Sequence, residues 1–146
     1  MDILGTLRRG RERVARGWVR NEFHNFVGYC ARGAVLLDDD NLMTNNSGDT
    51  DAEKALMAGI IEGMSERVVT LFDSAVKLVY KHSEGDDMEL SPGNHIAYWN
   101  NRVASSRSDV VAAFDRAIEI VERQRASLAS AALAGAPASE EQLELL

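Results

Sequence analysis

Apolar residues recur at three- and four-residue intervals along most of the chain, which is the spacing of an amphipathic helix. The longest such pattern covers residues 57–79 and predicts one long helix with a kink at Gly63. Its apolar positions are Met57, Ile60, Ile61, Met64, Val68, Leu71, Phe72, Ala75, Leu78 and Val79. A second long pattern, at residues 110–128, predicts a last helix that Ser106 or Ser108 caps. We expect the apolar faces of these two helices to pack against each other.

Shorter patterns predict the remaining helices. Residues 3–19 form one helical pattern, for which Gly17 is a plausible stop, and residues 29–37 form a brief second one. Ser91-Pro92 is a typical helix start and predicts a short helix through residue 100. No alternating apolar and polar run is long enough to predict a strand. The predicted fold class is therefore all-α, an irregular helical bundle with two long and two or three short helices.

Two segments lack a helical pattern. Residues 38–51 are rich in Asp, Asn and other turn formers, and predict an unusually long loop. From residue 131 the chain becomes rich in Ala, Gly, Pro and Ser and then acidic, which predicts a flexible acidic tail over residues 131–146. A length of 146 residues suits one domain, which we place at residues 1–130.

Charge is unevenly distributed along the chain. The net charge is −7, but residues 1–33 carry +4 and the rest −11. The predicted first helix places four arginines in one stripe, a candidate interaction surface: Arg9, Arg13, Arg16 and Arg20. Guanidinium groups suit phosphates, yet the few lysines, the absence of interleaved aromatics and the acidic remainder disfavour nucleic acid. An acidic protein or a second copy is the preferred target. Arg11 falls in the apolar stripe instead, so we expect it to pair with a carboxylate of another helix.

The residues that commonly bind metals do not form a recognisable site. The acidic loop fails the calcium-loop pattern, because Leu42 and Met43 stand where a ligand and a glycine are required. The three histidines and the one cysteine show no helical metal-site spacing. We therefore expect no metal and no other cofactor.

Catalytic signatures are equally scarce. Cys30 lacks any local motif of a cysteine nucleophile, and we interpret it as a small buried thiol. Trp99 is interpreted as a core residue and Asn100 as a cap on the short helix. The alternative is a small-molecule or enzyme site between the first two helices and Trp99, with Arg11, Cys30, Trp99 and Asn100 as candidate pocket residues.

The compartment follows from what the sequence lacks. One cysteine cannot form an internal disulfide, which favours a reducing environment. The N-terminus has no apolar segment of a secretory signal, and the apolar runs are too short to span a bilayer. We expect a cytoplasmic protein without membrane contact.

Several short motifs resemble a known family. The first helix ends in Gly17-Trp18, residues 30–34 read Cys-x-x-Gly-Ala, residues 96–100 read Ile-x-x-Trp-Asn, and a helical segment at 109–118 follows. This order resembles a family of short actinobacterial and actinophage proteins classed as a domain of unknown function. The family usually has Asp where this chain has Asn101, and its loop and middle helix are shorter. The resemblance implies a shared fold, an origin in a phage or its host and, for a phage protein, the host cytoplasm; it implies no activity.

Taken together, these features favour a noncatalytic protein-interaction domain that acts on a host protein or as a homodimer. The alternative is a small-molecule-binding or enzymatic domain with a site near Cys30 and Trp99. A further alternative is weak nucleic-acid binding through the arginine stripe. An enzyme is disfavoured because no catalytic motif is present.

Overall fold

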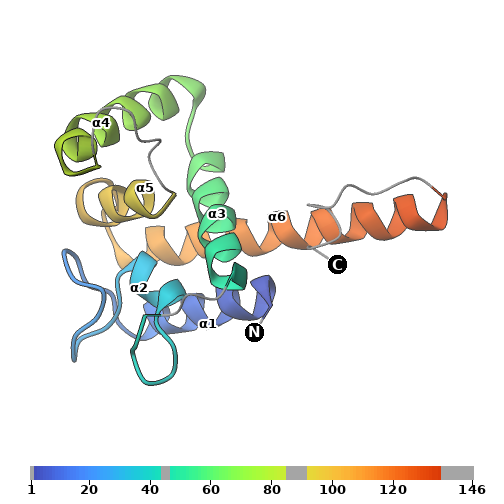
Figure 1. The fold of residues 1–146 in the computed structure, drawn as a ribbon, viewed down its shortest axis with the longest axis horizontal. Coiled ribbons are helices and arrows are strands. Elements are labelled where there is room, and N and C mark those ends of the chain that lie inside the picture. Colours follow the sequence, from blue (N-terminus) through green and yellow to red (C-terminus); the bar gives the residue numbers. More distant parts are fainter. Residues whose placement is uncertain (1, 44–46, 85–91, 136–146) are drawn as a thin grey trace.

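The computed structural model describes residues 2–43, 47–84 and 92–135, and within them every regular element is helical (Figure 1). The elements are α1 (Ile3–Arg16), α2 (Ala31–Leu36), α3 (Ser47–Glu62), α4 (Glu66–Glu84), α5 (Pro92–Tyr98), the π-helical turn η1 (Trp99–Val103) and α6 (Arg107–Leu133). Isolated bridges are the only β-type pairings among these residues. The predicted all-α bundle is confirmed.

The core lies where α1 and α3 pack on α6. Helix α6 runs through the molecule, α1 lies alongside it and α3 crosses it steeply (Figure 1). Phe114 of α6, Leu7 of α1 and Leu56 of α3 are fully buried at this junction. Gly59 allows α3 to approach closely, since a Cβ there would lie 2.5 Å from the carbonyl oxygen of Ala113. The predicted packing of Phe114 in the core is therefore confirmed.

Local capping explains where the first and last helices begin and end. The Asp2 carboxylate accepts a 2.7 Å hydrogen bond from the Gly5 amide and caps α1. Gly17 ends α1, as predicted, although the helix stops at Arg16 rather than near residue 19. Ser106 caps α6 by accepting from the amide of Asp109, which also confirms a sequence prediction.

The predicted single helix over residues 57–79 is wrong. Helix α3 ends at Glu62 and α4 begins at Glu66, and α4 turns away from α6 toward α5 (Figure 1). Glycine at position 63 has low helix propensity, and Ser65 caps the next helix by accepting from the Val68 amide at 3.3 Å. Arg116 of α6 occupies the space beside the bend, 2.7 Å from where a Cβ of Gly63 would lie. Only the α3 half of the predicted stripe therefore packs against α6.

Two predicted boundaries also change. The loop expected at residues 38–51 is shorter, because Leu37 and Met43 pair in an isolated bridge and α3 already begins at Ser47. Helix α6 continues to Leu133, past the predicted start of the tail at residue 131. Residues 136–146 of that tail lie outside the described residues. No helix of the described residues has the length and apolar character needed to cross a membrane.

Candidate functional site

Helix α4 leaves part of its apolar surface uncovered. One side packs on α5 through Phe72 and Val76, which are buried, and the Phe72 ring meets the His95 ring edge-on at 5.6 Å. On the other side Leu71 is 62% exposed and Leu78 is 75% exposed. The prediction that Leu71 packs against α6 is therefore wrong. The Leu71 side chain faces solvent because the bend after α3 directs α4 away from the core.

Apolar residues of α4 form a line, which we call the α4 seam. Its members are Val68, Leu71 and Leu78, which are exposed, and Ala75, which is half-buried. Their spacing of three, four and three residues is that of a heptad repeat, so they follow one another along one face of the helix. A separate groove of about 620 Å³ lies at the α3–α4 bend, and its lining includes none of the seam residues. It is lined by Ile61, Met64, Glu66, Arg67, Val69 and Thr70.

The charged groups in the middle of α4 are engaged with each other or with α5. Asp73 accepts from Lys77 Nζ at 2.9 Å, and its other oxygen lies 2.9 Å from His95 Nε2. The hydrogen bonds from His95 and Lys77 hold the pKa of Asp73 below its usual range. The seam residues themselves carry no charge. Apolar contact is therefore the chemistry that this surface offers.

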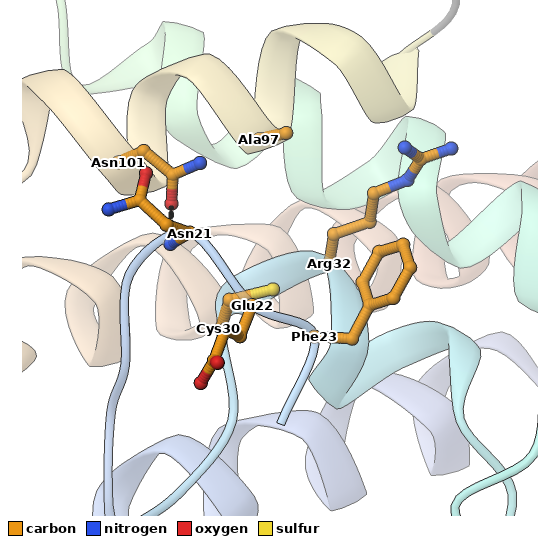
Figure 2. A pocket seen from close by; sticks show the side chains of 7 residues that line it. All are labelled: Asn21, Glu22, Phe23, Cys30, Arg32, Ala97 and Asn101. Atoms are coloured by element: carbon orange, nitrogen blue, oxygen red, sulfur yellow. Dashed lines mark hydrogen bonds between the residues drawn. The ribbon is translucent and has the colours of Figure 1, made fainter. Parts of the chain in front are cut away.

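A second candidate site is a cavity of about 270 Å³ beside Cys30 (Figure 2). It is lined by Asn21, Glu22, Phe23, Cys30, Arg32, Ala97 and Asn101. Figure 2 shows the side chain of Asn101 directed at Asn21, while the guanidinium of Arg32 points away from both Asn101 and Cys30. The charged and amide groups around this cavity therefore do not converge on one point within it.

Several polar groups of this cavity already make contacts within the fold. Asn101 Oδ1 accepts the Asn21 amide at 2.8 Å. Glu22 accepts a hydrogen bond from the side-chain amide of Asn25 at 2.6 Å. Arg32 Nε lies 3.4 Å from Glu53 Oε2 on α3. A ligand would have to displace these internal contacts, and an enzyme site usually offers polar groups that are free to reach the substrate.

Cys30 is a buried structural thiol, as predicted. It caps α2, and its sulfur accepts from the Gly33 amide at 3.2 Å. Burial raises the pKa of the thiol, whereas a cysteine nucleophile needs a lowered pKa to form thiolate near neutral pH. Its slow reaction with thiol reagents stays a prediction.

Asn100 joins two distant parts of the chain. It is fully buried on the π-helical turn, and its Oδ1 accepts from Trp18 Nε1 at 2.7 Å and from the Ala31 amide at 2.9 Å. Its Nδ2 donates to Val19 O at 3.1 Å and to Asn101 Oδ1 at 2.9 Å. The prediction that it caps the short helix is wrong, because these bonds instead fix the loop between α1 and α2. Trp99 beside it is buried in the core, as predicted.

The four arginines of the predicted stripe do not form one free surface. Arg9 and Arg13 donate to carbonyls at the C-terminal end of α2. Their acceptors are Val35 O for Arg9 (2.9 Å), and Ala34 O (3.2 Å), Leu37 O (2.5 Å) and Asp38 O (2.9 Å) for Arg13. Arg20 lies beyond the end of α1 and donates to Ala104 O at 2.7 Å. Arg16 remains at the surface, paired with Glu12. These groups mainly hold the bundle together, and a role for them in binding stays a prediction.

Arg11 confirms one prediction and departs from another. Its Nε donates to Asp115 of α6 at 2.5 Å, so it does pair with a carboxylate of another helix. Both side chains are about half exposed, at 44% and 53%. Arg11 is therefore neither buried nor part of the cavity that Cys30 lines.

Within the described ranges, no group of three His, Cys, Asp or Glu side chains could hold a metal ion.

Comparison with known protein families gives a match over residues 1–120. The model of DUF6197, a family of unknown function, matches residues 1–120, so the chain belongs to this family. No curated protein matches the chain, and neither does any solved structure. The family match ends within α6, which continues to Leu133.

Proposed function

We propose that this protein is a noncatalytic protein-interaction domain and that the α4 seam is its binding surface. The observation that carries this proposal is the exposure of Leu71 and Leu78, at 62% and 75%, in one line on a helix that buries Phe72 and Val76 against α5 on another side. Burying a leucine side chain contributes about 1.5–3 kcal/mol, so two such residues provide a substantial driving force for binding. An exposed apolar line of this kind is typical of helix-mediated recognition.

Two observations weigh against the alternative functions. In the cavity beside Cys30, Asn101 and Glu22 already accept hydrogen bonds within the fold, and the pKa of the thiol is raised. Nucleic-acid binding through the arginine stripe would need free cations there, yet Arg9, Arg13 and Arg20 donate to backbone carbonyls. We further propose a reducing, cytoplasmic setting, since the one cysteine is a buried thiol. The origin in actinobacteria or their phages stays a prediction.

Affinity capture with matched variants tests the proposal. Wild type, a Leu71→Glu/Leu78→Glu variant and a control variant, Gln124→Glu/Ser127→Glu, would be used as baits in an actinobacterial lysate. All four positions are exposed, so each double variant should keep the wild-type melting temperature within a few degrees. Both pairs add two negative charges, but only the first pair places them in the apolar seam.

We expect wild type and the control to retain the same protein in similar amounts. The seam variant should retain about a tenth of that amount or less, because burying unpaired carboxylates in an apolar contact is strongly unfavourable. Equal retention by all three baits would contradict the proposal. Mass spectrometry of the retained bands is the measurement.

A further inference from the structure

We infer that α4 is a separately unfolding unit of the bundle, and that its docking on α5 controls whether the α4 seam is presented. In the open state α4 is unfolded from α5 while the other helices stay packed. The second half of this inference rests on the proposed function, because it concerns the regulation of the same surface. The attachment of α4 to the rest of the molecule carries both halves.

A narrow face of α4 attaches it to the bundle. Phe72, Val76 and Tyr80 follow one another at four-residue intervals, so they lie on one side of the helix. The first two are buried and Tyr80 is half-buried. The centroid of the Phe72 ring lies 5.6 Å from that of His95 and 6.0 Å from that of Tyr98, both on α5. Phe72 is therefore the main apolar anchor of α4.

A polar contact supplements this anchor. Asp73 Oδ1 lies 2.9 Å from His95 Nε2, and Asp73 Oδ2 lies 2.9 Å from Lys77 Nζ. The carboxylate is 43% exposed, and ion pairs that remain in water contribute little to stability. The docked position of α4 therefore depends chiefly on the burial of Phe72 and Val76.

Helix α4 has fewer packed neighbours than the helices of the core. Among the described residues, α5 is the helix with which α4 makes its extensive contact, whereas α6 packs on both α1 and α3. Figure 1 shows α4 at one end of the molecule, next to α5 and away from α6. Helix α5 also packs on α2 and α3, so it has support without α4. A region with few buried apolar contacts opens more easily than the core.

The sequence of α4 gives the helix little stability of its own. Five of its residues are β-branched, which lowers helix propensity: Val68, Val69, Thr70, Val76 and Val79. Most of the stability of a helix in a protein comes from the packing of its apolar face. Once α4 leaves α5 it should therefore unfold. The seam is then lost as well, because its residues are aligned only in a helix.

Amide hydrogen exchange of the purified full-length protein tests the separate unfolding. After correction for intrinsic rates, the amides of residues 69–80 should exchange at least about a hundredfold faster than the slowest amides of α6. Urea should accelerate the exchange of α4 less steeply than that of α6, because opening α4 alone exposes less surface than unfolding the bundle.

Two truncations at neighbouring positions of α4 provide the matched comparison. Phe72→Ala removes the buried anchor and should raise the exchange rate in α4 at least about tenfold, with α6 unchanged. Leu71→Ala removes an exposed side chain and should leave both helices within about threefold of wild type. A core truncation, Val121→Ala, should do the reverse of Phe72→Ala, with exchange raised roughly tenfold in α6 and unchanged in α4.

A double variant tests the control of the seam. Phe72→Ala/Val76→Ala lacks both buried anchors but keeps every seam residue, so α4 should be mostly unfolded. Its far-UV circular dichroism should fall by about the share of one helix of 19 residues. As bait in an actinobacterial lysate it should retain about a tenth of the protein that wild type retains, or less, because apparent affinity falls with the fraction of molecules in the binding conformation.

Each contrary result has a distinct meaning. Equal exchange in α4 and α6, a Phe72→Ala variant that changes both helices alike, or a double variant that unfolds as a whole overturns the separate unfolding. Capture by the double variant at the wild-type level overturns the control of the seam. If Leu71→Glu/Leu78→Glu also captures as much as wild type, the proposed function fails, whereas the exchange result stands because it needs no partner.

Discussion

Helices α6 and α4 have similar apolar periodicity and opposite environments. In α6 the apolar residues Val110, Phe114 and Val121 are at most 1% exposed, because α1 and α3 both pack on that face. In α4 the seam residues Leu71 and Leu78 stay exposed, because α5 covers a different side of the helix. Periodicity therefore predicts that a helix has an apolar face, but the number of helices that reach it decides whether it becomes core or surface.

The largest expected effect comes from truncating one side chain in each helix. Phe114→Ala should lower the free energy of unfolding by about 3–5 kcal/mol, because it leaves a cavity in the core. Leu71→Ala should change it by less than about 0.5 kcal/mol, because that side chain faces solvent. Urea unfolding at low micromolar protein measures both. Similar losses in the two variants would mean that α4 is buried in solution, and the contrast between the helices would then disappear.

Much of the fold could be predicted because its causes are local. The caps of α1 and α6 and the all-α class follow from side chains within a few residues of the helix ends. The break between α3 and α4 could not be predicted in this way. The apolar residues continue in phase across Gly63, and the contact with Arg116 that fills the bend comes from a distant part of the chain.

The candidate site was less predictable, for a related reason. The burial of Cys30 followed from its own small apolar side chain, but the roles of Asn100 and Arg13 depend on partners that are distant in sequence. The arginine stripe was predicted as a free surface because an isolated helix has no neighbours. Two of its four members instead donate to part-buried carbonyls at the end of α2.

A smaller effect is expected at the link between η1 and the loop that joins α1 to α2. Asn100→Ala removes the acceptor of Trp18 Nε1 and of the Ala31 amide, and leaves one donor in a part-buried site and one in a buried site unsatisfied. The cost should be about 1–3 kcal/mol. Amide hydrogen exchange should rise most in residues 17–31, while the α1–α6 core stays protected. Gln124→Ala, at an exposed position of α6, is the control and should change neither quantity. Uniform loss of protection across all helices would show that Asn100 supports the whole core rather than this link.

The smallest expected effect concerns the contact that holds α4 on α5. Hydrogen bonds from His95 and Lys77 lower the pKa of Asp73 in the folded protein, so its ionised form stabilises the fold above the unfolded-state pKa. This contribution is lost as the pH falls through the lowered folded-state value. Because the carboxylate is 43% exposed, solvent screening keeps its contribution to the free energy of unfolding below about 1 kcal/mol. Asp73→Asn should therefore lower stability slightly at about pH 6 and have a smaller effect near pH 2, where the wild-type carboxylate is itself protonated. Hydrogen exchange should place the difference in α4, with α6 as the internal reference. If the substitution changed α6 as much as α4 at the higher pH, the two helices would unfold together and α4 would be as firmly held as the core.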